Sequence, residues 1–337
     1  MNLEELNVEK ELKIVYMGTP IFSAVVLEGL LSRYKIRAVV TQPDRPSGRG
    51  GKYNKPPVKR VAEDRAILVV QPSKIKDDIE EILSLEPDLI ITCAYGQILP
   101  KEIIDYPRLG CINVHASLLP KLRGGAPIHR AIINGFKETG VTIMYMNEAM
   151  DEGDMIEKAS IPIEDDDTAS TLHDKLCILG RDLLLKTLPS ILDGSNKRIK
   201  QNEDEATYGF IIKREDEKIN FSKTKKEIYD QIRGLNSYPG AYCKFEGKIL
   251  KVWESYKTDN SFSHLVDGQI TNVYKDGIGV KVSNGEIVLT VVQPEGKNKM
   301  KATDFANGKG SLVGKILEWK RSLKSLKNLH LIKEIAL

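Results

Sequence analysis

An asparagine and a histidine stand one residue apart in the apolar run CINVHASLLP, residues 111–120. Residues i and i+2 of a β-strand point to the same face, so Asn113 and His115 are expected to project together while Val114 packs behind them. The run ends near Ser117, which places the pair at the carboxyl end of its strand, where open α/β sheets bind their ligands.

A carboxylate partner for this histidine follows in the stretch AMDEGDMI, which places Asp151 and Asp154 around a glycine after another apolar strand. A histidine with an amide donor and a carboxylate is a set suited to general acid–base catalysis and oxyanion stabilisation. No serine-elbow sequence accompanies it, so we expect direct attack by a substrate nucleophile rather than a covalent enzyme intermediate. The other histidines are interpreted as structural: His129, His173, His264 and His330.

A second unusual stretch, TQPDRPSGRGGKYNKPPVKR at residues 41–60, is basic and rich in proline and glycine. Its cations face a single acidic residue, Asp44, and comprise Arg45, Arg49, Lys52, Lys55, Lys59 and Arg60. Its prolines and glycines predict that no regular element forms there. A basic, adjustable segment suits a phosphate backbone, and the alternative is a mobile, solvated loop.

The elements that position these residues are read from the apolar periodicity. A continuous apolar run at Leu12–Met17 ends in Gly-Thr-Pro, and apolar residues at helical spacing follow from Phe22 to Leu30. The Gly-Thr-Pro turn lacks the GxGxxG pattern of a dinucleotide site. Further strands are expected at Ile36–Thr41, Leu68–Gln71, Asp88–Ala94, Cys111–His115 and Val141–Met146, with helices at 75–85, 126–135 and 169–188. This alternation predicts a doubly wound, Rossmann-like parallel sheet.

The pattern changes after about residue 195. Residues 196–209 are polar and without period, which predicts a linker. A helical pattern at Lys223–Leu235 then precedes short apolar runs separated by turn residues, which predicts a small OB-like β-barrel. The predicted domains are 12–195 (Rossmann-like), 210–317 (barrel) and 318–337 (a helical tail without an assigned role).

Composition and charge exclude several classes of protein. The chain has 337 residues, 41% of them hydrophobic, and no apolar run reaches the roughly 20 residues that span a membrane. The N-terminus lacks a signal peptide, and scattered cysteines predict reduced thiols without a metal site. Residues 213–337 carry 23 Lys+Arg and 15 Asp+Glu, a balance of +8, which with the −5 of the remainder gives the net +3. An anionic partner for the basic part is expected, the alternative being a solvated surface.

These motifs resemble the 10-formyltetrahydrofolate-dependent formyltransferases. The N-x-H of INVHASLLP, the D-x-G of MDEGD and the intervening RGGAPIHRAI carry the resemblance. The basic loop TQPDRPSGRG, the stretch AYGQILP and the predicted barrel resemble those members that act on methionine esterified to initiator tRNA. The resemblance covers residues 12–317, so the acidic leader and the helical tail fall outside it.

The resemblance implies a reaction and its catalytic residues. The formyl group of 10-formyltetrahydrofolate passes to the α-amino group of the methionine, through a tetrahedral intermediate and without a metal ion. Asn113 and His115 would stabilise the oxyanion, and Asp151 would orient His115 and relay protons.

The resemblance also implies binding residues. The folate would lie against Ala94, Tyr95, Gly96, Ile98, Ser117, Leu118, Leu119 and Pro120. The acceptor stem and 3′ end of the tRNA would contact Arg45, Arg49 and Lys52, with Phe22 bordering the methionine or 3′-end site. We expect a cytoplasmic protein that works as a monomer, without a membrane partner.

Two other functions fit parts of the sequence. A small-molecule formyltransferase or a formyltetrahydrofolate hydrolase would share Asn113, His115 and Asp151, but would not need the basic loop or the basic barrel. A nucleic-acid-binding protein would use the loop and barrel and leave the catalytic set structural. Only a formyltransferase that acts on tRNA uses both halves of the chain.

Overall fold

The computed structural model describes residues 12–47 and 52–319 and divides into two compact units. Unit 1 comprises the chain up to Ile128 together with Glu138–Ile163 and Thr171–Phe210. Unit 2 comprises His129–Lys137, Glu164–Ser170 and the chain from Ile211. Among the described helices, none has the length and apolar composition needed to span a bilayer. The predicted domain boundaries stay a prediction.

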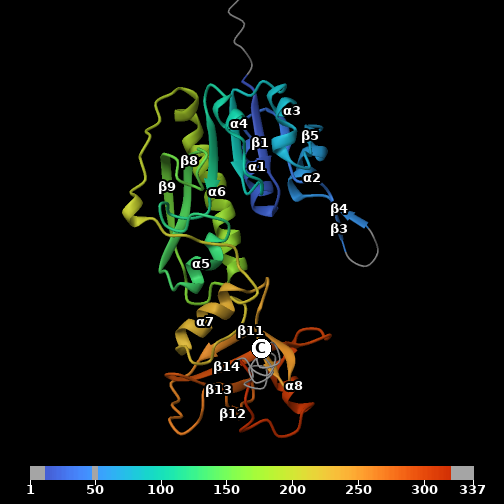
Figure 1. The fold of residues 1–337 in the computed structure, drawn as a ribbon, viewed down its shortest axis with the longest axis vertical. Helices are drawn as coiled ribbons and strands as arrows, with labels where there is room; N and C mark the ends of the chain where they lie inside the picture. The colour runs from blue at the N-terminus through green and yellow to red at the C-terminus, as the bar shows by residue number, and fades with distance from the viewer. Residues whose placement is uncertain (1–11, 48–51, 320–337) are drawn as a thin grey trace, which may run out of the picture. The chain divides into compact units, whose positions relative to one another are not determined.

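Unit 1 is built on a seven-stranded sheet of order β5-β2-β1-β6-β7-β8-β9 (Figure 1). Its strands are β1 (Ile14–Gly18), β2 (Ile36–Val40), β5 (Leu68–Val70), β6 (Leu89–Cys93), β7 (Cys111–His115), β8 (Glu138–Tyr145) and β9 (Met155–Pro162). The first five are parallel, whereas β8 and β9 are antiparallel to their neighbours. The predicted fold class is confirmed, although the sheet is mixed rather than wholly parallel.

Helices cover both faces of this sheet because its central strands are apolar throughout. The helices of unit 1 are α1 (Ile21–Leu31), α2 (Pro57–Asp64), η1 (Ile75–Asp77), α3 (Ile79–Leu83), α4 (Lys101–Asp105), α6 (Ala169–Leu192) and η2 (Glu203–Glu205), and the chain passes from one unit to the other within α5 (Pro127–Ile133). Val15 and Met17 of β1 belong to a core that includes Ile82 and Ile103 of α3 and α4. Tyr16 points to the other face, where its hydroxyl donates to the Ser23 carbonyl of α1 over 2.7 Å.

The basic stretch at 41–60 contains regular structure, so the prediction that none would form there was wrong. A two-stranded hairpin pairs β3 (Arg45–Ser47) with β4 (Lys52–Asn54) and extends away from the main sheet (Figure 1). Helix α2 then begins at Pro57, because proline is favoured in the first turn, where its missing N–H needs no partner. A two-stranded ribbon also tolerates Pro46, whose missing donor is lost at an edge strand.

Unit 2 contains an antiparallel sheet of order β10-β11-β14-β13-β12, with β15 paired to β14. Its elements are α7 (Lys225–Gly234), β10 (Ala241–Phe245), β11 (Lys248–Lys257), β12 (Ile270–Val273), β13 (Ile278–Val282), β14 (Gly285–Pro294), β15 (Met300–Lys301) and α8 (Ala302–Asn307). The chain near Leu317 closes this sheet, because Glu318 bridges to Lys244 of β10 while Ile316 bridges to Gln269 beside β12. The result is the closed barrel that the spacing of short strands predicted.

Candidate active site

The carboxyl edge of the parallel strands brings the predicted catalytic residues together. β1 and β6 are adjacent and lie where the strand order reverses, which is the position at which open α/β sheets bind ligands. β7 follows β6, and its last residues include Asn113 and His115. The hydroxyl of Thr19, after β1, donates to the Tyr95 carbonyl after β6 over 2.9 Å. The chain segments that leave these strands are therefore held against one another.

His115 is 6% exposed and has an oxygen acceptor beside each ring nitrogen. Its Nε2 lies 3.1 Å from the carbonyl oxygen of Leu122, and its Nδ1 lies 3.5 Å from Oδ1 of Asp151. A carbonyl can only accept, so Nε2 carries the hydrogen of this bond, and Nδ1 has the lone pair when the ring is neutral. A proton taken up at Nδ1 would be stabilised by the carboxylate of Asp151.

Asp151 is held in place by two hydrogen bonds and by its backbone conformation. Its Oδ2 accepts a hydrogen bond from the backbone N–H of Gly124 over 2.8 Å, and its carbonyl accepts one from Gln201 Nε2 over 2.7 Å. Its φ of 55° lies in the left-handed region, which aspartate and asparagine tolerate better than most residues. The hydrogen bond from Gly124 therefore holds one carboxylate oxygen while the other faces His115.

Asn113 presents a free amide donor within the described residues 12–47 and 52–319. The hydroxyl of Thr92 on β6 lies 2.9 Å from Asn113 Oδ1 and can donate to it, which orients the amide group. No described residue accepts a hydrogen bond from Asn113 Nδ2. An oriented donor without a partner beside a histidine suits a developing negative charge on a substrate oxygen.

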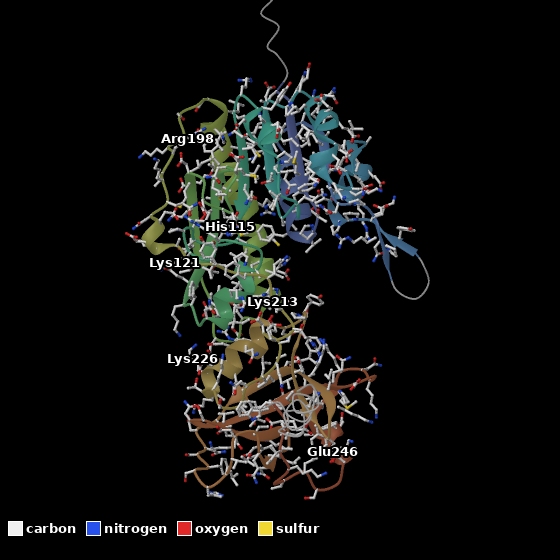
Figure 2. All side chains as sticks on the ribbon, viewed as in Figure 1. His115, Lys121, Arg198, Lys213, Lys226 and Glu246 are labelled. Carbon is white, nitrogen blue, oxygen red and sulfur yellow. The ribbon has the colours of Figure 1, made fainter. Side chains whose placement is uncertain are left out.

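The loop after β7 is rigid and mostly buried. Ser117 Oγ donates to the Lys121 carbonyl over 2.6 Å, and Thr142 Oγ1 on β8 donates to the Ser117 carbonyl over 2.7 Å. Leu122 has a φ of 59°, an unfavourable value for leucine that aims its carbonyl at His115. Figure 2 labels His115 within unit 1 and Lys121 at its surface.

The predicted folate residues lie on the loops that follow β6 and β7. Tyr95, Ser117, Leu119 and Pro120 are buried, Leu118 is half-buried, and Ala94, Gly96 and Ile98 are exposed. Burial raises the pKa of Tyr95 to about 12, and the nearby Asp78 carboxylate adds to the shift, so its phenol is neutral. Ile98 is 86% exposed and is free to cover an apolar ligand face. Their contact with folate stays a prediction.

The predicted tRNA residues are distributed over separate elements. Arg45 is exposed on β3, and Lys52 belongs to β4. Arg49 lies outside the described residues. Phe22 is 5% exposed in α1, with its ring 5.7 Å from that of His173 on α6, so it presents little surface to a ligand.

The sequence of the 41–60 stretch suggested cations with a single acidic neighbour. Two of its lysines are nevertheless paired with carboxylates. Lys59 pairs with Asp44 and Lys55 pairs with Glu63, each over 2.8 Å. The hydrogen bond from Lys59, with a second from Gln71, lowers the pKa of Asp44.

Sequence reasoning missed the residues that support the catalytic set. Arg123 is fully buried and forms a paired hydrogen bond with Glu203, 2.9 Å and 2.7 Å between their atoms. The Thr207 hydroxyl accepts from the Leu122 N–H over 2.9 Å. Both partners come from residues 196–209, which were predicted to be a linker. Only the RGGAP motif drew attention to this loop, and the backbone groups of Leu122 and Gly124 leave no side-chain signal.

The fold and the family models place this chain in the class of formyl transferases. The family model described as "Formyl transferase" matches residues 12–188, and the model described as "Formyl transferase, C-terminal domain" matches residues 211–310. The solved structure of WlaRD, a sugar 3N-formyl transferase, is 22% identical with a TM-score of 0.64, covering 86% of this chain and 99% of its own. HypX from Aquifex aeolicus in complex with tetrahydrofolic acid is 16% identical with a TM-score of 0.63, covering 92% of this chain and 50% of its own.

Curated relatives narrow this class. The methionyl-tRNA formyltransferase of Bacillus licheniformis is 52% identical over 306 residues, covering 90% of this chain and 96% of its own. Those of Bacillus subtilis and Macrococcus caseolyticus are 50% and 49% identical, each covering 90% of this chain and 97% of its own. This chain belongs to the methionyl-tRNA formyltransferase family. The resemblance predicted from its motifs is thereby confirmed. Within the described residues, no group of three or more His, Cys, Asp or Glu is placed to hold a metal ion.

Proposed function

We propose that the protein transfers the formyl group of 10-formyltetrahydrofolate to the α-amino group of methionine esterified to initiator tRNA. The observation that carries the catalytic part is the convergence of Asn113, His115 and Asp151 at the carboxyl edge of β7. Family membership supports the substrates. The product, N-formylmethionyl-tRNA, serves translation initiation, and we infer a cytoplasmic enzyme that acts as a monomer.

The chemistry begins with the neutral amine as nucleophile. A free α-amino group has a pKa of about 8, and esterification of the carboxyl lowers it, so a neutral fraction exists at pH 7. A bond forms from the amine nitrogen to the formyl carbon, and the carbonyl oxygen becomes an oxyanion. Asn113 Nδ2 donates to this oxygen, and His115 beside it stabilises the negative charge once its Nδ1 is protonated.

Proton transfer completes the reaction. His115 Nδ1 accepts the proton that leaves the amine, through water, and Asp151 stabilises the resulting imidazolium. His115 then returns the proton to N10 as the bond from the formyl carbon to N10 breaks, which releases tetrahydrofolate. Each charge that develops faces a side chain of the protein, so the proposed mechanism uses no metal ion.

The folate would lie against the loops after β6 and β7. Backbone groups of these loops would read the pterin edge, and Leu118 and Ile98 would cover its faces. These loops adjoin Asn113 and His115 in the chain, which brings the formyl carbon to the donors. The assay that tests the proposal is formyl transfer from 10-formyltetrahydrofolate to charged initiator tRNA, with uncharged tRNA and glycinamide ribonucleotide as controls.

The β3–β4 hairpin is the proposed contact with the acceptor stem, and we expect Arg45→Ala and Arg49→Ala each to raise KM for charged tRNA. The exposed Arg45 has no acidic partner among the described residues. Loss of one phosphate contact should flatten the salt dependence of KM by about one unit of slope. Steady-state kinetics over a salt series measure this, and limited trypsin digestion should show that bound tRNA slows cleavage at residues 45–52.

Lys55→Ala is the matched control for the hairpin, because Glu63 already neutralises that lysine. It should leave KM and the salt slope nearly unchanged, and folate affinity should be unaltered in all three variants. An unchanged KM for both arginine variants, with trypsin cutting first elsewhere, would remove the hairpin from tRNA binding.

Two lysines beside a tryptophan in unit 2 are a second proposed contact with tRNA. We expect the double variant Lys251→Gln, Lys299→Gln to bind tRNA more weakly. The Nζ atoms of Lys251 and Lys299 lie 5.3 Å and 3.5 Å from the centre of the Trp253 ring. Removing both charges should raise KM for tRNA about tenfold and lower the salt slope by about two, because each cation displaces a counterion from a phosphate.

The control for these lysines replaces two exposed lysines of unit 1, Lys186→Gln and Lys197→Gln, with the same change in net charge. Its KM should stay within about twofold of the parent, because net charge alone acts weakly over distance at physiological salt. Equal effects of the two double variants would mean that Lys251 and Lys299 make no specific contact.

A further inference from the structure

Two exposed aromatic rings lie stacked at the end of unit 1. The ring centres of Tyr208 and Phe210 are 5.3 Å apart, and their planes differ by 5°. Tyr208 is 44% exposed and Phe210 is 59% exposed. The two residues are i and i+2 of an extended segment, so they project from the same side of it. A parallel pair of rings with this much exposed surface is preformed for a third flat ring.

The segment that carries these rings is bonded directly to the catalytic loop. Thr207 accepts from the Arg123 N–H over 2.9 Å, and the Gly209 N–H donates to the Arg123 carbonyl over 2.7 Å. Arg123 stands between Leu122, whose carbonyl accepts from His115, and Gly124, whose N–H donates to Asp151. The segment that carries the stack is therefore hydrogen-bonded to Arg123, whose two neighbours in the chain contact His115 and Asp151.

A glycine and an exposed methionine lie beside the segment that carries the stack. A Cβ placed on Gly124 would lie 3.4 Å from the carbonyl oxygen of Gly209 and 3.4 Å from the sulfur of Met150, so both flank this glycine closely. Met150 is itself 54% exposed. The loop residue that bonds to the stack segment, Arg123, has a fully buried side chain that is paired with Glu203. The rings thus stand on a fixed support.

We propose that the Tyr208–Phe210 stack binds the base of the 3′-terminal adenosine of the substrate tRNA. This inference rests on the proposed function, in which the methionine is esterified to the ribose of that nucleotide. Its amine must reach Asn113 and His115, so the base on the same ribose must lie beside the catalytic loop. Aromatic side chains bind unpaired bases by stacking in many proteins that recognise single-stranded ends.

The kinetic test replaces each ring with leucine, which keeps apolar bulk but cannot stack. Phe210→Leu and Tyr208→Leu should each raise KM for charged tRNA about tenfold, with kcat within about threefold, because a lost base stack typically weakens binding by that order. Tyr106→Leu is the matched control, since Tyr106 is 46% exposed and precedes β7 at the opposite edge of the sheet. It should leave KM unchanged. Phe210→Trp should keep the parent KM.

The direct test uses uncharged initiator tRNA with 2-aminopurine in place of the terminal adenine. Stacking quenches this fluorophore, so the parent protein and Phe210→Trp should quench it and Phe210→Leu should not. Absence of methionine from this ligand separates a base contact from a methionine contact. A KM rise without loss of quenching would overturn the inference, as would an unchanged KM in both leucine variants.

The two levels of the hypothesis are separable. If the parent protein formylates charged tRNA while Phe210→Leu retains full quenching, the stack inference fails and the proposed function stands. If the parent protein does not formylate charged tRNA, the proposed function fails and the stack inference fails with it. Thermal melting of each variant confirms folding, and Phe210→Trp keeps the test decisive where a leucine variant melts early.

Discussion

Replacement of His115 by alanine is expected to lower kcat for formyl transfer by two or more decades while folate still binds. The imidazole lies 3.5 Å from the Asp151 carboxylate and is two residues from Asn113 on the same strand. Acid–base catalysis of this kind typically contributes 10²–10⁴-fold. Because the loss falls on the transition state, KM for either substrate should change much less.

Asp151→Asn isolates the charge from the geometry. Asparagine tolerates the left-handed backbone of this position and can still accept from the Gly124 N–H, so the loop should keep its conformation. The imidazolium then loses its counter-charge, and kcat should fall by about two decades. Single-turnover formylation at saturating folate measures this, with folate affinity followed by fluorescence titration.

His264→Ala, on an exposed residue of unit 2, is the control for both substitutions and should retain the parent rate. A His115 or Asp151 variant that kept more than a tenth of the parent kcat would exclude that residue from the mechanism. A loss of folate binding in step with kcat would instead assign it to the folate site.

The strands were predictable where burial is two-sided. β7 has the predicted bounds, Cys111–His115, and all of its residues are buried except the half-buried Asn113. β9 was missed because it lies at the edge of the sheet, where Met155 and Ile156 are buried and most later positions are not. An edge strand with a mixed pattern has no periodicity that separates it from a loop.

The sequence could indicate the side chains of the candidate site, but not the backbone groups that orient them. Asn113, His115 and Asp151 could be proposed from the sequence because an amide, an imidazole and a carboxylate are residue types that do acid–base and oxyanion chemistry, and their catalytic roles stay a prediction. The groups that aim them include the Leu122 carbonyl and the Gly124 N–H, which are backbone groups and are not specified by residue type. The residues around Thr207 looked like a linker because a hydrogen bond from a backbone N–H to a side chain 85 positions away has no local signature.

Hairpin β3–β4 shows the limit of composition as a guide. Proline and glycine usually interrupt helices and strands. Pro46 nevertheless lies opposite Tyr53 in a ladder of three residue pairs. A ribbon of two strands leaves half of its backbone groups facing outward, so a missing N–H costs little there. The same residues in a central strand would have broken the sheet.

Replacement of Asn113 by alanine is expected to slow formyl transfer by about 10²–10³-fold, which is the usual effect of removing one oxyanion donor. The Asn113 amide is oriented by the Thr92 hydroxyl at 2.9 Å and has no acceptor for its Nδ2 among the described residues. Asn113→Asp should be slower still, because it replaces a donor by a carboxylate that repels the oxyanion. Stopped reactions at saturating substrates give kcat for each variant.

Thr92→Val tests whether the orientation of the amide matters separately from its presence. Valine keeps the shape of threonine but removes the hydroxyl, so Asn113 Oδ1 loses its partner while Nδ2 remains. We expect kcat to fall about tenfold, since one neutral hydrogen bond contributes on the order of 1 kcal/mol, and KM to stay nearly constant. Thr92→Ser, which restores the hydroxyl, should recover most of the rate. If Asn113→Ala instead kept kcat and raised KM for folate, Asn113 would bind the ground state, and the oxyanion would have to be stabilised by His115 alone.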